Sequence, residues 1–354
     1  MTDGEIIQAA AERLVSWYRT NRRELPWRRE PSPYRVWVAE IMLQQTRIEA
    51  VIGYYRRFLD ALPDLPALAA VEEDRLLKLW EGLGYYSRAR NLKKTAVRVM
   101  ERYGGELPRA AAELKTLPGI GDYTAGAIAS IAYGEPEPAV DGNVLRVVMR
   151  LLACSDDVLL PATRRRVTEL LRAVYPRGGD AALLTEGIME LGETVCIPNG
   201  EALCGLCPLS GICRGRQRGT VRDYPFRSPP KERRRETRTV LLLRCGERYA
   251  IRRRPESGLL AGLWEFPSWE GELDPEALSA CLGVPLRCTP CGQAKHVFSH
   301  VEWRMRAYFA ECETQPEGFL WRTAREIDED VSIPTAFRYF KQKMLEQEEK
   351  RTTA

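Results

Sequence analysis

The spacing of hydrophobic positions changes partway along this chain. In residues 4–20, apolar side chains such as Ile6, Ala10 and Leu14 recur every three or four positions, which predicts an amphipathic helix. Three further stretches share this helical character: residues 34–48, 49–103 (two or three helices) and 143–195. The first part of the chain is therefore expected to form an all-α domain.

After residue 238 the apolar segments become short and β-rich. Strands are expected at residues 239–245 and 249–255, in a buried aromatic segment within 258–267, and as a strand pair at 296–310. Helices are expected at residues 274–282 and 334–348. This pattern predicts a second domain of the α+β class, so the fold is multi-domain.

A basic, proline-containing segment separates the helical part of the chain from the β-rich part. Residues 214–238 hold nine arginines and one lysine against three acids, whereas the whole chain of 354 residues has a net charge of +4. Contact with nucleic acid is therefore expected to be local. The expected divisions are a catalytic domain at 1–218, a linker at 219–235 and a second domain at 236–350.

Four of the ten cysteines crowd into eighteen residues. They are Cys196, Cys204, Cys207 and Cys213, with the spacing C-x7-C-x2-C-x5-C. Zn²⁺ and a [4Fe–4S] cluster both accept four thiolates. The single C-x2-C pair and the uneven loops favour the iron–sulfur cluster. Cys288, Cys291, His296 and His300 offer a second, much weaker zinc alternative.

No targeting segment is visible in the first twenty residues, which carry Asp3 and Glu5 and lack an apolar core. No run of eighteen apolar residues predicts a membrane span. The expected location is cytoplasmic, and associated with the nucleoid if the source is bacterial.

Glu40 lies within the apolar run VWVAEIML. Burial of an unpaired carboxylate is costly, so its pKa rises and it can hold a proton near neutral pH. The alternative is that Glu40 pairs with an arginine in the core. Gln45 and Thr46 end the same predicted helix with groups that can reach base edges.

Two glycine turns indicate contact with DNA. LPGIG at 117–121 lies between predicted helices at 109–115 and 123–133, so its backbone amides can approach a phosphate. Asp141 follows, as an acid able to stabilise positive charge on a sugar. The turn WEGLGYYSRARNL at 80–92 combines tyrosines with Arg88 and Arg90, which suits a wedge into a base stack and phosphate contacts. The plainer interpretation of both turns is structural.

These motifs together resemble the MutY adenine DNA glycosylases of the endonuclease III, or helix-hairpin-helix, superfamily. The matching stretches are LPWR (25–28), VWVAEIMLQQTR (36–47), WEGLGYYSRARNL (80–92), LPGIGDYTAGAIASIA (117–132), AVDGNVLRV (139–147), ELGETVC with the cysteine cluster (190–213), GLLAGLWEFP (258–267) and VFSHVEW (297–303). The resemblance covers nearly the whole chain.

The resemblance implies a fold. A helix-hairpin-helix subdomain is expected at about 30–135, and an iron–sulfur helical subdomain at 1–29 plus 136–218, holding one [4Fe–4S] cluster. A Nudix-like domain is expected at 236–350. Because the G-x5-E…RE-x2-EE pattern is absent from the sequence, that domain is expected to bind and not to hydrolyse.

The resemblance also implies excision of adenine paired with 8-oxoguanine or guanine in double-stranded DNA, after base flipping. The protein is expected to act as a monomer. The implied catalytic residues are Glu40, Asp141, Tyr123 and Asn143, and the implied adenine pocket is Arg23, Trp27, Arg28 and Glu186. The implied DNA and 8-oxoguanine contacts are Gln45, Thr46, Leu83, Tyr85, Gly119, Gly121, Phe298, Ser299 and His300.

One position separates two reaction types. Bifunctional relatives carry a lysine two residues after LPGxG, where this sequence has Tyr123. A phenol cannot form the imine that precedes strand cleavage, so a monofunctional glycosylase is expected. The first cluster loop, Ile197–Leu203, is one residue longer than is usual in the family. Two other functions stay open: a mismatch thymine glycosylase on the same scaffold, and a catalytically silent lesion-binding protein.

Overall fold

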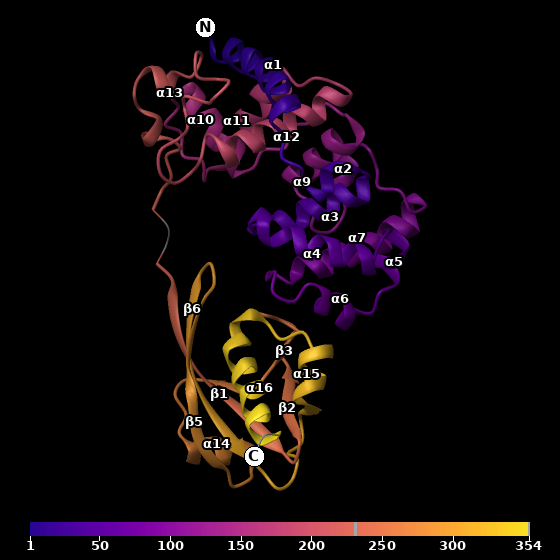
Figure 1. The fold of residues 1–354 in the computed structure, drawn as a ribbon, viewed down its shortest axis with the longest axis vertical. Coiled ribbons are helices and arrows are strands. Elements are labelled where there is room, and N and C mark those ends of the chain that lie inside the picture. Colours follow the sequence, from indigo (N-terminus) through magenta and orange to yellow (C-terminus); the bar gives the residue numbers. More distant parts are fainter. Residues whose placement is uncertain (230–231, 353–354) are drawn as a thin grey trace. The chain divides into compact units, whose positions relative to one another are not determined.

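The computed structural model describes residues 1–229 and 232–352, which divide into two compact units (Figure 1). The helical unit comprises Met1–Val71 and Arg90–Pro229, and the C-terminal unit comprises Glu72–Ala89 and the chain after Pro229. Glu72–Ala89 thus groups with the C-terminal unit, whereas its sequence lies inside the predicted helix-hairpin-helix subdomain.

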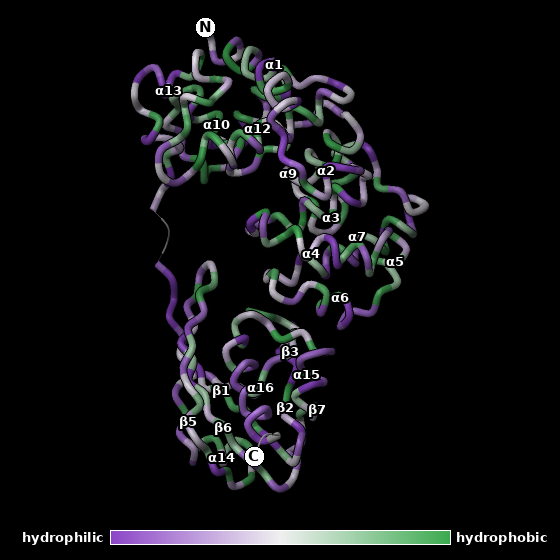
Figure 2. The backbone as a smooth tube through the Cα atoms, in the orientation of Figure 1, coloured by the Kyte–Doolittle hydropathy of each residue, from purple (hydrophilic) through white to green (hydrophobic). Residues whose placement is uncertain are grey.

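The helical unit and the segment Glu72–Ala89, which lie within the described residues 1–229, contain helices and no strands. They are α1 (Asp3–Asn21), α2 (Pro26–Arg29), α3 (Pro33–Leu43), α4 (Ile48–Ala61), α5 (Leu65–Ala70), α6 (Glu73–Leu79), α7 (Ser87–Tyr103), α8 (Ala111–Leu114), α9 (Asp122–Ala127), the π-helix η1 (Ile128–Ala132), α10 (Gly142–Leu152), α11 (Pro161–Arg172), α12 (Gly179–Thr194), α13 (Arg214–Gln217) and the 3-10 turn η2 (Val221–Asp223). Hydrophobic and hydrophilic residues alternate at short intervals along them (Figure 2), as expected of helices with one face in a core.

The predicted helices at 4–20 and 143–195 are confirmed, and four differences stand out. The helix predicted at 34–48 ends at Leu43, because the backbone leaves the helical region at Gln44 (ψ 111°) and Gln45 then adopts a left-handed conformation with φ 58°. Residues 49–103 hold four helices, and the helix predicted at 109–115 is the single turn α8. The helix predicted at 123–133 continues from α9 into a π-helix.

The core of the helical unit joins its N-terminus to the segments around the cysteines. Helix α1 begins with a capping box between Thr2 and Glu5, and it packs on α12. Ile7 and Leu14 of α1 share one buried cluster with Val148 of α10 and Leu184 of α12. This cluster fixes the axes of α10 and α12, two helices that carry several of the polar residues described below.

The C-terminal unit is built on a seven-stranded mixed sheet. Its elements are β1 (Arg234–Cys245), β2 (Arg248–Arg253), β3 (Trp264–Glu265), β4 (Ser268–Glu270), α14 (Pro275–Leu282), β5 (Arg287–Val297), β6 (Val301–Glu311), β7 (Leu320–Thr323), α15 (Ala324–Asp330), η3 (Thr335–Phe337) and α16 (Arg338–Thr352). The strand order is β3-β2-β1-β6-β5, with β4 beside β1 and β7 beside β2. Among the strands of the described residues, β1 and β6 form the one parallel pair, and the other pairs are antiparallel.

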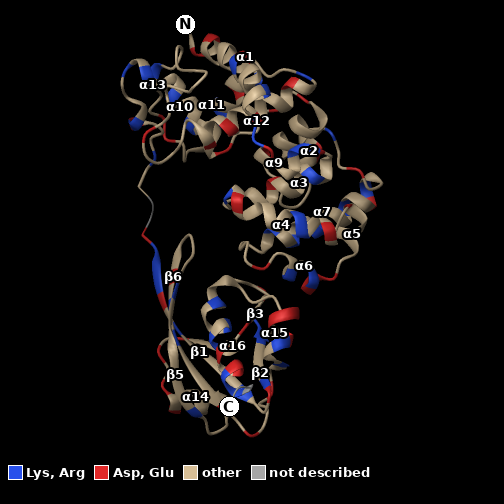
Figure 3. Cartoon of the chain, in the orientation of Figure 1, with Lys and Arg blue, Asp and Glu red and all other residues tan. Residues whose placement is uncertain are grey.

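Both faces of this sheet are covered. Leu242 of β1 shares a cluster with Ile327 and Phe340 of the helices α15 and α16, while Leu241 of β1 shares another with Leu278 of α14. Burial on both faces explains why the centre of β1 is a continuous apolar run. The strand predicted at 239–245 is confirmed, but β1 begins earlier, in the arginine-rich start that Figure 3 shows in blue.

Among the described residues, no helix combines the length and the apolar character needed to cross a membrane.

Candidate active site

A cleft of about 1040 Å³ opens in the helical unit, lined by residues from α2, α3, α9, α10 and α12. Eleven of the residues predicted for the site line it: Arg23, Trp27, Arg28, Glu40, Gln45, Thr46, Gly121, Tyr123, Asp141, Asn143 and Glu186. The fold therefore gathers side chains that are up to 163 positions apart in the sequence (Arg23 to Glu186).

Glu40 lies in the middle of α3 and is 5% exposed. The hydroxyl of Tyr123, from the second position of α9, donates a hydrogen bond to Glu40 Oε2 at 2.5 Å. Burial raises the pKa of Glu40 to about 7, although the Tyr123 hydrogen bond opposes the rise. Glu40 can thus carry a proton near neutral pH, and its hydrogen-bond partner is a phenol and not the core arginine considered as an alternative.

Asp141 occupies a different environment, at the N-cap of α10. Its side chain accepts hydrogen bonds from the backbone N–H of Val144 at 2.8 Å and from Asn143 Nδ2 at 2.9 Å. Burial raises the pKa of Asp141, but hydrogen bonds from Val144 and Asn143 and the charge of Arg146 act in the opposite direction. The helix N-terminus also favours an anion at this position. These contacts stabilise the ionised form of Asp141.

Asn143 connects Asp141 to the cysteine-rich segment. Its amide also donates to Glu193 at 3.0 Å, and its oxygen accepts from Arg146 Nη2 at 2.8 Å. Arg146 Nε in turn donates to the backbone oxygen of Cys196 at 2.8 Å. The orientation of the Asn143 amide is therefore fixed from both sides.

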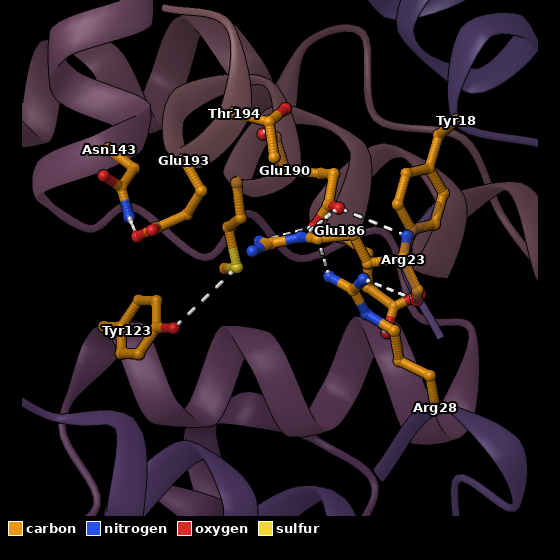
Figure 4. A network of polar contacts seen from close by, with 10 residues as sticks. Tyr18, Arg23, Arg28, Tyr123, Asn143, Glu186, Glu190, Glu193 and Thr194 are labelled. Atoms are coloured by element: carbon orange, nitrogen blue, oxygen red, sulfur yellow. Dashed lines mark hydrogen bonds and ion pairs between the residues drawn. The ribbon is translucent and has the colours of Figure 1, made fainter. Parts of the chain in front are cut away.

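A second cluster of polar side chains lies against α12, where the carboxylates of Glu186 and Glu190 meet the guanidinium groups of Arg23 and Arg28 (Figure 4). Glu190, 1% exposed, accepts hydrogen bonds from Arg23 Nε at 2.6 Å and from Arg28 Nη2 at 2.9 Å. Arg28 also forms an ion pair with Glu186 at 3.6 Å, and Tyr18 donates to Glu186 at 3.1 Å. Burial raises the pKa of Glu186, whereas the two arginines outweigh burial and lower the pKa of Glu190.

Sequence reasoning missed Tyr18, Glu190 and Glu193. A signal for the two acids was available: Glu186, Glu190 and Glu193 recur at i, i+4 and i+7, which places them on one face of a predicted helix. No such signal exists for Tyr18, because its partner lies 168 positions away.

Trp27 forms a further wall of the cleft. Its ring is 6% exposed and meets Tyr55 edge to face, with centroids 5.4 Å apart. At the end of α3, Gln44 donates to Thr124 at 3.3 Å, and Gln45 and Thr46 follow in the turn. Gln45 and Thr46 both line the cleft, and their contact with base edges stays a prediction.

The glycine turn at 117–121 precedes α9. Gly119 has φ +76°, and a Cβ there would lie 2.7 Å from the Cβ of Asn91, so the turn requires glycine. Gly121, the N-cap of α9, has open space around its Cα. The backbone at Gly121 is therefore accessible to a phosphate.

The turn between α6 and α7 differs from expectation. Tyr85 is 50% exposed, as a wedge requires, but Leu83 is 7% exposed. Arg88, predicted to hold phosphate, is 8% exposed and donates to the backbone oxygens of Leu83 and Gly84. The prediction that Arg88 faces DNA is wrong, because its guanidinium group points into the protein.

The four clustered cysteines line one small cavity of about 30 Å³. No three His, Cys, Asp or Glu side chains in the described part of the chain are spaced to hold a single metal ion. Arg150, 6% exposed, lies 3.4 Å from Cys196 Sγ through its Nη1, so a buried cation faces this set of thiols.

The other cysteine pair cannot form a site. Cys288 and Cys291 are three positions apart in β5 and belong to different hydrophobic clusters, on opposite faces of the sheet. The weak zinc alternative is therefore wrong.

Phe298, Ser299 and His300 form the tip of the β5–β6 hairpin. Phe298 packs edge to face on Trp303 at 4.9 Å and on His296 at 4.6 Å. Ser299 and His300 are exposed, with Ser299 Oγ 3.2 Å from His300 Nδ1. An aromatic anchor thus presents two polar side chains to solvent.

Known proteins resemble this chain throughout. Residues 38–177 match the HhH-GPD superfamily of base excision DNA repair proteins, and residues 239–343 match the NUDIX domain. The adenine DNA glycosylase of Homo sapiens is 35% identical, over 92% of this chain and 72% of that protein. The Mus musculus enzyme of the same name is 35% identical, over 94% and 77%. The chain belongs to the adenine DNA glycosylase family.

As a member of this family, the chain is a DNA glycosylase, an enzyme that hydrolyses N-glycosyl bonds. Two solved structures share the helical fold. A thermostable thymine-DNA glycosylase matches with a TM-score of 0.55 and 27% identity, over 60% of this chain and 98% of that one. Endonuclease III, trapped covalently on DNA, matches with a TM-score of 0.52 and 26% identity, over 62% and 99%. The predicted helix-hairpin-helix and Nudix-like architecture is confirmed.

Replacing Glu40 with glutamine is expected to stabilise the glycosylase at alkaline pH. The folded-state pKa of about 7 exceeds the ordinary value of 4.5. Between these values the folded state binds more protons than the unfolded state, so stability falls as pH rises from 4.5 to 7, by up to about 3 kcal/mol. Glutamine cannot ionise and still accepts the Tyr123 hydrogen bond.

Urea unfolding from pH 4 to 9 measures this effect. Glu40→Gln should gain stability over the parent protein as pH rises and keep the full gain above pH 7, while the difference is small below pH 4.5. Glu101→Gln, on the exposed side of α7, controls for the loss of a carboxylate. Parallel stability curves for Glu40→Gln and the parent would contradict the raised pKa.

Proposed function

We propose that this enzyme hydrolyses the N-glycosidic bond of adenine paired with 8-oxoguanine or guanine in double-stranded DNA. The observation that carries the proposal is the joint placement of a buried carboxyl, Glu40, and a capped carboxylate, Asp141, in one cleft. Family membership supports adenine as the substrate. The base is flipped into this cleft, at an expected cost of a few kcal/mol.

Glu40 acts as the general acid. Its raised pKa keeps the carboxyl protonated at the start of the reaction, and protonation of the adenine ring makes the departing base a neutral leaving group. Tyr123, hydrogen-bonded to Glu40, holds the carboxyl in one orientation. The acid is thus positioned before the glycosidic bond breaks.

Asp141 acts as the ionised partner. As the base leaves, positive charge develops on the sugar, and a carboxylate held by Val144 and Asn143 stabilises it. Keeping one carboxyl protonated and the other ionised is the general logic of glycoside cleavage. Water then completes the hydrolysis.

The adenine pocket is formed by Arg23, Trp27, Arg28 and Glu186. Trp27 supplies an apolar wall, and the arginines are held by the carboxylates of α12. Gly119 and Gly121 bind phosphate through the hairpin backbone. Gln45, Thr46, Leu83 and Tyr85 surround the 8-oxoguanine, with Tyr85 as the wedge.

The β5–β6 hairpin reads the oxidised base. Guanine presents N7 as an acceptor, whereas 8-oxoguanine carries a hydrogen there and becomes a donor. The exposed Ser299 hydroxyl can accept that hydrogen bond, and Phe298 anchors the hairpin on Trp303. The same unit binds without hydrolysing, because the sequence lacks the Nudix catalytic pattern.

Cys196, Cys204, Cys207 and Cys213 hold one [4Fe–4S] cluster. Four thiols around one cavity and a buried arginine beside Cys196 fit a group of net negative charge. The cluster supplies structure to the segment after α12, and the proposed steps of base removal involve the residues of the cleft.

The central test compares single-turnover base release from two duplexes. The parent enzyme should release adenine opposite 8-oxoguanine and leave thymine opposite guanine intact. Glu40→Gln should bind the first duplex with unchanged affinity and release adenine at least about 100-fold more slowly, because a general acid contributes roughly 10²–10⁴. Borohydride should trap no covalent adduct, since Tyr123 cannot form an imine. Release of thymine alone would refute the proposal.

Ser299→Ala is expected to weaken discrimination between 8-oxoguanine and guanine. Loss of one neutral hydrogen bond should reduce the affinity for the 8-oxoguanine duplex roughly fivefold, while adenine opposite guanine is processed as before. Ser257→Ala, an exposed serine of the same unit, is the control. An equal loss on both duplexes would remove Ser299 from base reading.

The metal is tested on the purified protein. A [4Fe–4S] cluster should give a brown protein with broad absorbance near about 400 nm, as expected of iron–sulfur thiolate centres, and about four irons per chain. Cys204→Ser should lose iron and colour. A colourless protein with stoichiometric zinc would contradict the assignment.

A further inference from the structure

The turn that carries Tyr85 is held in an unusual backbone conformation. Gly82 and Gly84 have φ values of +100° and +69°, and Tyr85, although not a glycine, has φ +48°. A left-handed conformation is unfavourable for a residue with a side chain, and it persists where surrounding contacts determine it. The contacts that determine it come from Trp80 and Arg88.

Arg88 binds the backbone of this turn at three points. Its own N–H donates to the oxygen of Tyr85 at 2.9 Å, and its Nη2 donates to the oxygens of Leu83 at 3.0 Å and Gly84 at 3.1 Å. Trp80 Nε1 also donates to the Gly84 oxygen at 3.1 Å. Three consecutive carbonyl groups, from Leu83 to Tyr85, are therefore fixed in direction.

The same guanidinium group contacts two aromatic rings. Its central carbon lies 5.3 Å from the ring centroid of Trp80 and 5.7 Å from that of Tyr85. Trp80 is fully buried, whereas half of Tyr85 is exposed. A cation thus links the exposed ring to a ring of the core.

Arg88 keeps its charge in this position. Burial lowers its pKa to about 10, which is still well above neutral pH. The arginine therefore combines a full positive charge, a flat face and parallel donors. Lysine keeps the charge but has neither the flat face nor the planar fork of donors.

We propose that Arg88 is a positioning residue that sets Tyr85 in the wedge conformation before DNA arrives. Its hydrogen bonds fix the turn, and its flat face fixes the ring. The proposal rests on the proposed function, in which Tyr85 enters the base stack beside 8-oxoguanine. It differs from a phosphate contact, in which charge alone matters and the salt dependence of binding changes.

Four variants test it on the full-length enzyme: Arg88→Lys, Arg88→Met, Tyr85→Ala and the double variant Arg88→Met/Tyr85→Ala. Excision of adenine opposite 8-oxoguanine should slow roughly tenfold in each Arg88 variant, the scale of coupling between residues in contact. Arg88→Lys should fail to rescue, although it keeps the charge. The double variant should be no slower than Tyr85→Ala.

A spectroscopic measurement separates positioning from general damage. A 2-aminopurine placed next to the 8-oxoguanine should brighten when the parent enzyme opens the base stack, and this rise should be lost in both Arg88 variants and in Tyr85→Ala. The slope of binding against salt should stay unchanged in Arg88→Lys and Arg88→Met. Lys94→Met, an exposed charge on the same helix, controls for loss of charge alone.

The outcomes distinguish the wedge role of Tyr85 from the positioning role of Arg88. If Tyr85→Ala excises at the parental rate, the wedge role in the proposed function fails, and the role of Arg88 falls with it. If Tyr85→Ala is slow but the Arg88 losses add to it, or Arg88→Lys restores the rate, or the salt slope falls, then Arg88 does not position Tyr85 and the inference alone is overturned. Unfolding curves for Arg88→Lys confirm that the variant is folded.

Discussion

The contact on which the helical unit's chemistry depends is the hydrogen bond from Tyr123 to Glu40. A carboxyl group inside an apolar helix would be costly without a partner, and an ionised one more so. Tyr123 satisfies one carboxyl oxygen without adding charge, so it compensates for burial and leaves the pKa high. Glu40 can therefore be buried in α3 and still hold a proton near pH 7.

Two other carboxylates of the cleft are stabilised by partners of their own. Glu190 is neutralised by Arg23 and Arg28, and its pKa is low. Asp141 is held by a helix N-terminus and by Asn143, whose amide is oriented by Arg146. Burial raises the pKa of both Glu40 and Asp141, but the contacts of Asp141 oppose that rise and favour its ionised form. Each of the two carboxyl groups takes its hydrogen-bond partners from a different helix.

The sequence predicts much of the arrangement of side chains around the cleft, and the features that it does not predict have physical causes. The burial of Glu40 follows from the apolar residues on both sides, and the cap at Asp141 follows from the helical pattern after it. The early end of α3 does not, because it depends on the non-helical backbone of Gln44 and the left-handed backbone of Gln45. The direction of Arg88 does not either, because an arginine in a turn suits solvent and DNA equally well. Its inward direction depends on the ring of Trp80 and on the carbonyl groups of Leu83 and Gly84, which the fold brings to its guanidinium group.

The identity of residue 123 bears on two proposed properties of the enzyme: the protonation of Glu40 and the lack of strand cleavage. A lysine at this position would bring an ammonium group toward the carboxyl of Glu40, which Tyr123 contacts through its hydroxyl. An opposite charge at that distance lowers the pKa of a carboxyl group, so Glu40 would lose its proton near neutral pH. Tyr123 contacts Glu40 without adding a charge, and its hydrogen bond lowers the pKa of Glu40 by less than burial raises it. In the proposed function, this one side chain therefore bears both on the general acid and on the lack of an imine-forming amine.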